Sequence, residues 1–288
     1  MKTIQKEITP LSEEDLFIVL NHPSAEFDYS IHYHSDYEIN LVLDTYGKRI
    51  IGDSEELFSS LDLVFIGPNI PHAWKGVKTN GNHVITIQFS ESILDFPILK
   101  KRQFKQIKEL LHDSKRGVSF PEETKLEIKK RILELTKTQG FNTILEFLSI
   151  LHILSISEKQ LLMDSAYDTE SIARKSKSRR IEKVCNFIDN NYQKEIRLTD
   201  VSKMVNMSDS AFSHFFKKKT NSTFIDYLIN IRIAKACQLL SKTTHTIGEV
   251  CFTCGFNNLS NFIRIFKKRK KCTPGEYRKH INQMLTKY

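Results

Sequence analysis

The sequence predicts an α+β chain in three parts: an N-terminal β-barrel over residues 1–95, a helical region over 96–175 and an all-α domain over 176–288. Short β-rich runs broken by turn residues predict the barrel. A change to helical spacing of apolar residues after Pro97 predicts the middle region. A basic segment that repeats one helical pattern predicts the last domain. A chain of 288 residues is long enough for about two separate cores.

The N-terminal part contains short apolar runs between Phe17 and Phe89. Their length and their content of Val, Ile, Leu and Phe are typical of strands, and their regular spacing favours a sandwich or a barrel. The four runs are 38–43, 48–51, 61–66 and 83–89.

The middle part is predicted to hold three helices. The first two carry apolar stripes at helical spacing, namely Phe104, Ile107, Leu110 and Leu111, then Leu126, Ile128, Ile132, Leu133 and Leu135. The third, over about 142–162, is apolar nearly all round, so either its own domain or a second copy of the chain must cover it. We therefore expect a homodimer that associates through residues 95–165. The polar stretches 164–171 and 174–180 are interpreted as the interdomain linker.

The net positive charge is confined to the C-terminal part. Residues 176–288 carry 22 Lys and Arg against 8 Asp and Glu, whereas residues 1–175 carry 21 against 26. A small domain with this excess suits a polyanionic partner, nucleic acid first and an acidic membrane second, although a merely basic solvated face remains an alternative. The odd count of five cysteines, the lack of a long apolar run and the lack of a signal peptide indicate the cytoplasm.

The basic part contains one pattern twice, over 198–218 and 247–268. Each copy predicts a short helix, a turn at a residue able to adopt positive φ, and a second amphipathic helix. The turn residues are Asn206 and Gly255. A long apolar helix over 224–240 lies between the copies and is suited to bracing them side by side. The pattern predicts two helix-turn-helix units, whose apolar residues form their cores and leave no face for a membrane.

This segment resembles the AraC/XylS family of regulators. The resemblance covers about a hundred residues in a fixed order: Arg232, Ala236, Leu239 and Leu240; Ile247, Glu249, Val250, Gly255 and Phe256; Phe262, Phe266 and Lys267; Thr273, Pro274, Tyr277 and Arg278. Asn206, Asn221 and Lys271 stand where the family usually has Gly, and Ser202 and Cys251 where it usually has Ala. The resemblance implies a transcription regulator rather than an enzyme, with promoter DNA, RNA polymerase and a small-molecule effector as partners.

Two such helices can enter successive major grooves of DNA. The resemblance to the family also implies which side chains contact the DNA. Base contacts are expected from Ser210, Ser213 and His214 in the first unit and from Leu259, Ser260, Asn261 and Arg264 in the second. Arg264 can pair with both acceptors of guanine, although a phosphate contact is its alternative. Phosphate contacts are expected from Lys217, Lys218, Lys267, Lys268 and Arg269. Cys251 and Cys254 lack a second pair at zinc spacing, which disfavours a metal or redox site there.

Two N-terminal stretches, 32–38 and 62–74, resemble the paired motifs of the cupin barrel, a sensory domain of many AraC-type regulators. His32, His34, Glu38 and His72 match the four ligands of metal-binding cupins, and alternation along a strand puts the first three on one face. We expect these four to line an effector pocket. A metal ion there, a polar pocket without metal and purely structural histidines remain open, and a cupin-type enzyme is disfavoured by the fused DNA-binding segment.

Overall fold

The computed structural model describes residues 4–7, 9–11, 14–25, 27, 31–77, 79, 81–138, 140–166, 179–220 and 222–287. The chain divides into two compact units: residues 1–168 together with 284–288 form the first unit, and residues 169–283 form the second. Most of the expected linker, 167–178, and Asn221 lie outside the described residues. Among the described helices, none combines the length and the apolar character needed to cross a membrane.

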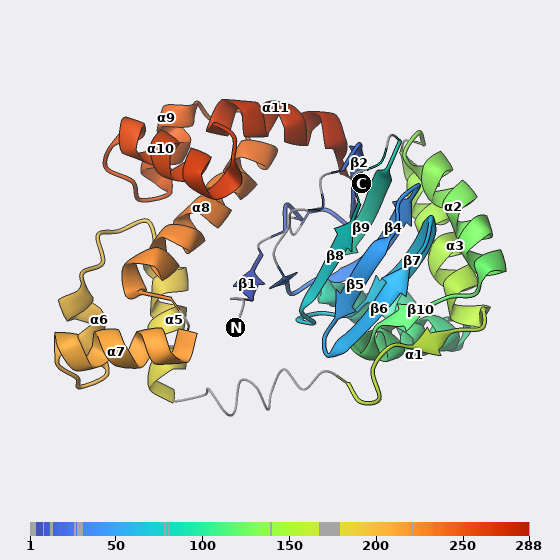
Figure 1. Ribbon diagram of the computed structural model, residues 1–288, viewed down its shortest axis with the longest axis horizontal. Helices are drawn as coiled ribbons and strands as arrows, with labels where there is room; N and C mark the ends of the chain where they lie inside the picture. Colours follow the sequence, from blue (N-terminus) through green and yellow to red (C-terminus); the bar gives the residue numbers. More distant parts are fainter. Residues whose placement is uncertain are drawn as a thin grey trace. The chain divides into compact units, whose positions relative to one another are not determined.

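The first unit is built on two sheets (Figure 1). One sheet has seven strands in the order β11-β10-β7-β4-β9-β2-β12. Its strands are β2 (Ile18–Pro23), β4 (Tyr37–Leu43), β7 (Leu61–Ile66), β9 (His83–Phe89), β10 (Val118–Ser119), β11 (Gln160–Leu161) and β12 (Leu285–Lys287). The other has five strands in the order β1-β3-β8-β5-β6. Its strands are β1 (Gln5–Lys6), β3 (His32–Tyr33), β5 (Gly47–Ile51), β6 (Ser54–Phe58) and β8 (His72–Gly76).

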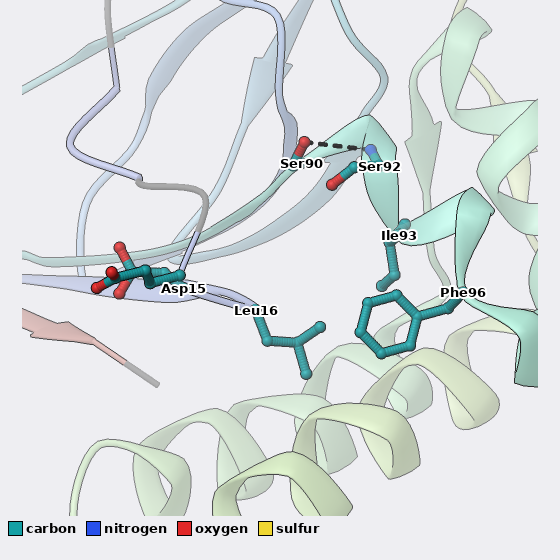
Figure 2. A pocket seen from close by; sticks show the side chains of 7 residues that line it. Asp15, Leu16, Ser90, Ser92, Ile93 and Phe96 are labelled. Atoms are coloured by element: carbon teal, nitrogen blue, oxygen red, sulfur yellow. Dashed lines mark hydrogen bonds between the residues drawn. The ribbon is translucent and has the colours of Figure 1, made fainter.

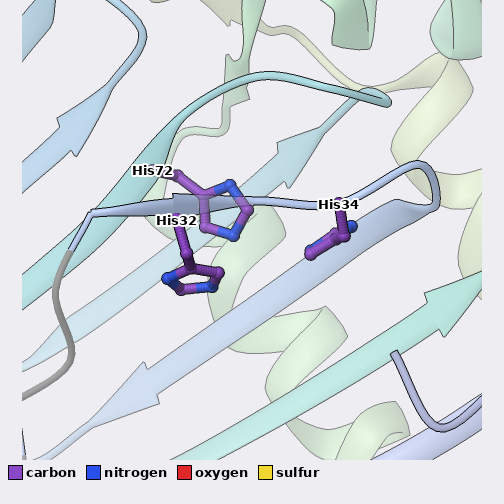
Figure 3. A group of neighbouring side chains, drawn as sticks. All are labelled: His32, His34 and His72. Carbon is purple, nitrogen blue, oxygen red and sulfur yellow. The ribbon is translucent and has the colours of Figure 1, made fainter. Parts of the chain in front are cut away.

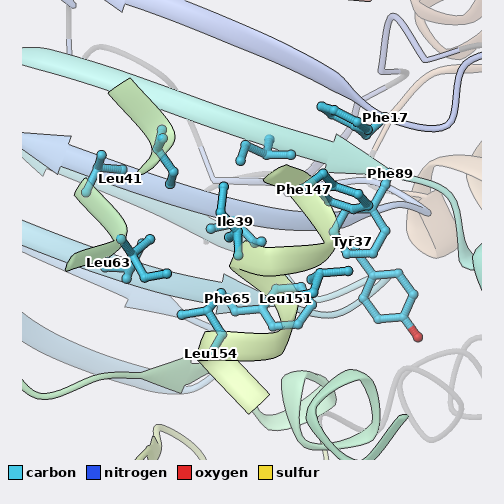
Figure 4. Packing of buried hydrophobic residues seen from close by; sticks show 14 of the residues in the cluster. Phe17, Tyr37, Ile39, Leu41, Leu63, Phe65, Phe89, Phe147, Leu151 and Leu154 are labelled. Carbon is cyan, nitrogen blue, oxygen red and sulfur yellow. The ribbon is translucent and has the colours of Figure 1, made fainter. Parts of the chain in front are cut away.

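Helices cover one face of the seven-stranded sheet (Figure 1). They are α1 (Lys105–Asp113), α2 (Glu122–Leu135) and α3 (Phe141–Ile156), accompanied by the short 3-10 turns η1 (Glu91–Asp95), η2 (Pro97–Lys100), η3 (Arg102–Phe104) and η4 (Ser114–Arg116). Phe147 of α3 stacks on Phe17 with ring centroids 4.3 Å apart and meets Phe89 of β9 edge-on at 5.1 Å (Figure 4). Strands and helices therefore share one core, and the helical region belongs to the same unit as the sheets.

The third helix is shorter than its apolar sequence suggests. It ends at Ile156, because Ser157 has extended backbone angles and the following chain returns to pair Leu161 with Val118 of β10. Leu126, expected in the stripe of the second helix, is 48% exposed. Hydrophobic spacing indicates which residues can be helical, but the strand pairing that ends this helix joins segments about 40 residues apart and leaves no local signal.

The second face of the seven-stranded sheet meets the five-stranded sheet. Between them lies a cluster of buried residues from both sheets and from adjoining loops: Val42, Val64, Ile66, Ile51, Phe58, Ile70, Trp74, Leu162 and Met163. A buried ion pair crosses the same interface, since Arg49 on β5 bonds Asp62 on β7, and Trp74 Nε1 donates to the second oxygen of Asp62 at 2.8 Å. Two facing sheets thus enclose an interior that holds polar as well as apolar groups.

The second unit is helical. Its helices are α5 (Arg179–Asn191), α6 (Leu198–Met204), α7 (Asp209–Thr220), α8 (Phe224–Lys242), α9 (Ile247–Thr253), α10 (Leu259–Lys270) and α11 (Pro274–Met284). Two separate apolar cores lie along α8. The first takes Phe224, Leu228 and Ile231 from α8, and the second takes Ile233, Ala236, Cys237 and Leu240. One pair of short helices packs around each core: α6 and α7 around the first, and α9 and α10 around the second.

The turns have the backbone that the sequence indicates. Asn206 has φ 54° between α6 and α7, and Gly255 has φ 81° between α9 and α10. Lys271, which follows α10, also adopts the left-handed conformation at φ 63°. A non-glycine residue in that region costs about 1–2 kcal/mol, which the surrounding helices must offset.

Candidate functional site

The second helix of the first helix-turn-helix, α7, has one buried and one exposed face. Phe212 and Phe216 are fully buried in the first core. Ser210, Ser213 and His214, the expected base-contacting residues, are exposed. His214 also lines an open pocket of about 490 Å³ with Lys217 and Lys218. The side chains expected to meet bases and phosphates of DNA therefore border one hollow on this helix.

The second helix of the other unit, α10, has the same arrangement. Asn258 caps it by accepting a hydrogen bond from the Asn261 backbone N–H at 2.8 Å. The expected base-contacting residues Leu259, Ser260, Asn261 and Arg264 are all exposed. Arg264 Nη2 donates to Asn261 Oδ1 at 2.8 Å, so these two side chains form one hydrogen-bonded group on the outer face.

The basic residues at the end of α10 differ in their surroundings. Lys267 and Lys268 are exposed, as expected for phosphate contacts. Arg269, assigned the same role from the sequence, forms an ion pair with Asp226 at the start of α8, with Nη2 to Oδ1 at 2.6 Å. A hydrogen bond from Thr223, followed by this contact with Arg269, lowers the pKa of Asp226. Arg269 therefore has a partner within the protein. Of the five residues expected to contact phosphates, it is the least available to DNA.

The three histidines singled out in the first unit come together (Figure 3). Strand pairing sets His32 on β3 opposite His72 on β8. The ring of His72 lies 4.4 Å from that of His32 and 5.0 Å from that of His34, and one ring nitrogen of each histidine lies within 4.8 Å of the others. His34 and His72 are buried, whereas His32 is half-buried and contacts Glu7 at 3.1 Å.

Glu38 is the buried carboxylate of this cluster. His34 Nε2 and Gln88 Nε2 each donate to Glu38 Oε2 at 2.9 Å. Burial alone would raise the pKa of Glu38, but the imidazoles of His72 and His34 and the amide of Gln88 lower it well below its usual range. Burial would lower the pKa of His34, yet its bond to Glu38 raises it. Both ring nitrogens of His34 face acceptors, the second being the Asp36 carbonyl at 3.0 Å, as suits an imidazolium.

His72 has the opposite character. Its Nδ1 lies 2.8 Å from the Ile70 carbonyl, to which it donates, and burial lowers its pKa to about 3. The ring is therefore neutral near neutral pH, with the lone pair on Nε2. That Nε2 is buried without a hydrogen-bond partner, since Glu38 Oε1 is 3.7 Å away. An acceptor nitrogen in this state is suited to a hydrogen-bond donor or a metal ion.

Three neighbouring polar residues were not identified from the sequence. Gln88 lies opposite Glu38 in the β4–β9 pairing, and its Oε1 is also buried without a partner. Thr86 donates to Asn40 at 3.2 Å on the same inner face. The sequence feature that could have identified them is the alternation of polar and apolar residues along β4 and β9. The same alternation is expected of a strand with one face in water, so it did not indicate that these residues are buried.

A separate small pocket lies elsewhere on the first unit (Figure 2). It encloses about 140 Å³ and is lined by Glu14, Asp15, Leu16, Ser90, Ser92, Ile93 and Phe96. Leu16, Ile93 and Phe96 give it an apolar wall, and the acidic and hydroxyl side chains form its rim. None of the four expected effector-binding residues lines it.

Known proteins resemble the chain over both units. A family described as a helix-turn-helix domain matches residues 201–280. The transcriptional activator RhaR of Mannheimia succiniciproducens is 23% identical over 287 residues, which are 94% of this chain and 97% of that protein. An HTH-type transcriptional regulator of Pseudoalteromonas carrageenovora, named for the cgkA 5' region, is 33% identical over 118 residues, 40% of this chain and 70% of that protein. The crystal structure of ToxT from Vibrio cholerae has a TM-score of 0.51 at 14% identity, over 92% of this chain and 98% of ToxT.

A basic helical unit with two helix-turn-helix pairs, in a chain that also holds a sheet-rich unit, defines a DNA-binding regulator of transcription. The chain belongs to the AraC-type family of these regulators, as its C-terminal motifs predict. The α+β class expected from the sequence is confirmed.

Proposed function

We propose that this regulator reads promoter DNA by placing α7 and α10 in two successive major grooves on one face of the duplex. The observation that carries the proposal is the repeated exposed polar face, on two helices with separate cores along one bracing helix, α8. Such helices fit adjacent grooves when they lie about 34 Å apart along the DNA axis. RNA polymerase is the partner at the promoter, and the cytoplasm is the compartment.

The exposed residues divide by chemistry into two roles. Ser210, Ser213 and His214 on α7, with Leu259, Ser260, Asn261 and Arg264 on α10, contact base edges. Lys217, Lys218, Lys267 and Lys268 contact phosphates, and Arg269 does so only if it leaves Asp226. Phosphate contacts supply affinity, and base contacts supply sequence preference.

The test of this function is the salt dependence of DNA binding by the full chain. With four lysines neutralising phosphates, affinity is expected to fall by about two orders of magnitude between about 50 and about 200 mM salt. Replacing Lys217 or Lys218 by alanine is expected to reduce the slope of log affinity against log salt by about 1 each. Binding can be followed by fluorescence anisotropy with promoter and random duplexes. A slope near zero would contradict the proposal.

We also propose that the interior around His32, His34, Glu38 and His72 binds the effector. The support is the pair of buried atoms without partners, His72 Nε2 and Gln88 Oε1, beside an ionised Glu38. Buried polar atoms are nearly always bonded, so an acceptor nitrogen and an acceptor oxygen together suit a ligand rich in hydroxyl or amino groups.

The same residues also fit a divalent transition metal. His72 presents a free imidazole lone pair, and the nearby His32 and His34 nitrogens complete a set of three. Glu38 could serve as a fourth ligand once His34 gives up its bond to that carboxylate. A bound ion would supply an electrophilic anchor for an oxygen-bearing effector.

Cobalt titration of the full chain tests whether a metal ion is one of the occupants. If a metal binds, Co²⁺ is expected to give d–d absorbance that saturates at about one ion per chain and disappears in His72→Ala. His112→Ala removes an exposed histidine outside the cluster and serves as control. Absence of absorbance in the wild-type chain would leave the organic effector as the occupant.

We further propose that the chain is a homodimer that associates through the outer face of α3. Phe141, Leu145 and Ile156 on that face are 70%, 49% and 54% exposed, and they lie at helical spacing with exposed His152 between them. Leu145→Asp is expected to shift sedimentation from dimer to monomer at micromolar concentration, because a charge would be buried in the contact. Leu57→Asp changes a residue of β6 that is 85% exposed and lies outside α3, and it should leave the dimer intact. A monomeric wild-type chain would contradict the proposal.

A further inference from the structure

The two helix-turn-helix cores of the second unit do not merge. Ile231 of α8 belongs to the first core and Ile233 to the second, and the residue between them is Arg232. Apolar packing therefore fixes each pair of short helices on its own stretch of α8. The angle between the two pairs depends on α8, which is continuous through this point, and on the contacts that join the cores beside it.

Arg232 makes contacts on both sides of that point. Its Nε donates to the Tyr192 carbonyl and its Nη2 to the Lys194 carbonyl, both at 2.8 Å, in the segment that follows α5 of the first core. The same guanidinium carbon lies 5.9 Å from the ring centroid of Phe256, which belongs to the second core. Burial lowers the pKa of Arg232, so this charge is held partly away from water.

The turn of the second helix-turn-helix packs against the same segment after α5, at the carbonyls of Tyr192 and Gln193. A Cβ at Gly255 would lie 2.5 Å from the Tyr192 oxygen and 2.8 Å from the Gln193 oxygen, closer than any side chain allows. Gly255 also has φ 81°, which L-residues rarely adopt. Only glycine therefore lets the α9–α10 turn approach the first core this closely.

A second polar contact lies nearer the N-terminal end of α8. Arg269 of α10 bonds Asp226 in the first turn of α8, the part of this helix that packs on the first core. The two cores are thus joined by polar contacts whose geometry is directional. Directional contacts hold an angle more tightly than an apolar surface, because a guanidinium donates in a fixed plane.

We propose that Arg232 is a positioning residue that sets the orientation of α10 relative to α7, and thereby determines which spacing between two DNA boxes the regulator accepts. The proposal rests on the paired groove reading proposed above. Each added base pair moves a box along the axis and rotates it around the duplex, so a fixed angle between the helices selects one spacing. Loosening the junction leaves each helix able to read its own box.

Selection from a random duplex library tests this with the full chain. The wild type is expected to yield two half-motifs at one spacing, preferred by at least about tenfold over spacings one base pair longer or shorter. Arg232→Lys should yield the same half-motifs with that preference reduced below about threefold, because an ammonium lacks the planar, fixed pair of N–H donors with which the guanidinium bonds both carbonyls. Gly255→Ala should act in the same direction.

Arg278→Lys is the matched control. Arg278 also donates to two carbonyls through Nε and Nη2, those of Leu240 and His245, but both belong to the second helix-turn-helix and its end of α8. It should lower thermal stability and leave the spacing preference unchanged. A preference kept by Arg232→Lys, or lost equally in Arg278→Lys, would overturn the positioning role. A wild type that selects a single half-motif would instead refute paired reading itself.

Discussion

Asp62→Ala is expected to lower the free energy of unfolding of the first unit by about 3–5 kcal/mol, the usual penalty for breaking a buried ion pair. Asp62 is 3% exposed, and it accepts bonds from Arg49 and from Trp74 Nε1 across the two sheets. Alanine leaves the buried guanidinium of Arg49 with Glu56 as its remaining partner. It also removes the hydrogen-bond acceptor of the Trp74 indole N–H. Trp74 is the only tryptophan of the chain, so its fluorescence during urea denaturation reports on this unit.

Glu55→Ala is the matched control. Glu55 pairs with Lys48 on the adjoining β5–β6 hairpin, but both side chains are about half exposed, at 51% and 45%. Water screens such a pair, so its loss should leave the unfolding midpoint nearly unchanged. A loss below about 1 kcal/mol for Asp62→Ala would mean that the interior admits water to the ion pair.

Arg264→Ala is expected to weaken binding to the specific site by about 1–3 kcal/mol and to relax preference at one base pair. In the free protein Arg264 already bonds Asn261 Oδ1, so its guanidinium is partly oriented before DNA arrives. Competition binding against operators substituted at each position measures the change. The loss should be concentrated at a guanine.

Lys268→Ala provides the comparison from the same helix. Lys268 is exposed near the C-terminal end of α10 and is assigned to phosphate. Its removal should weaken specific and random duplexes alike and reduce the salt slope by about 1. Equal losses on both kinds of DNA for Arg264→Ala would move that residue to the phosphate class.

The sequence by itself determined the family and most element types. The segments with a strong period, such as 61–66 and 83–89, form strands β7 and β9 with the expected bounds. The helix-turn-helix units follow from the repeated spacing of Phe212 and Phe216 with Phe262 and Phe266. Such local patterns survive folding because a buried face must repeat every two residues in a strand and every 3.6 in a helix. The motif resemblance singled out the histidines, but the expected alternation along one strand was wrong, because His32 lies on β3 of the five-stranded sheet and Glu38 on β4 of the seven-stranded sheet.

Tertiary structure alone decided what each polar group meets. Gln88 has the pattern of a residue facing water, and only the second sheet buries it beside Glu38. Arg269 lies in a basic run typical of DNA contacts, and only the fold brings Asp226 within 2.6 Å of it. The extended chain after Ile156 depends on strand pairing with β10. In each case the deciding partner is distant in sequence, so the interaction energy that fixes the residue's role has no trace in the local pattern.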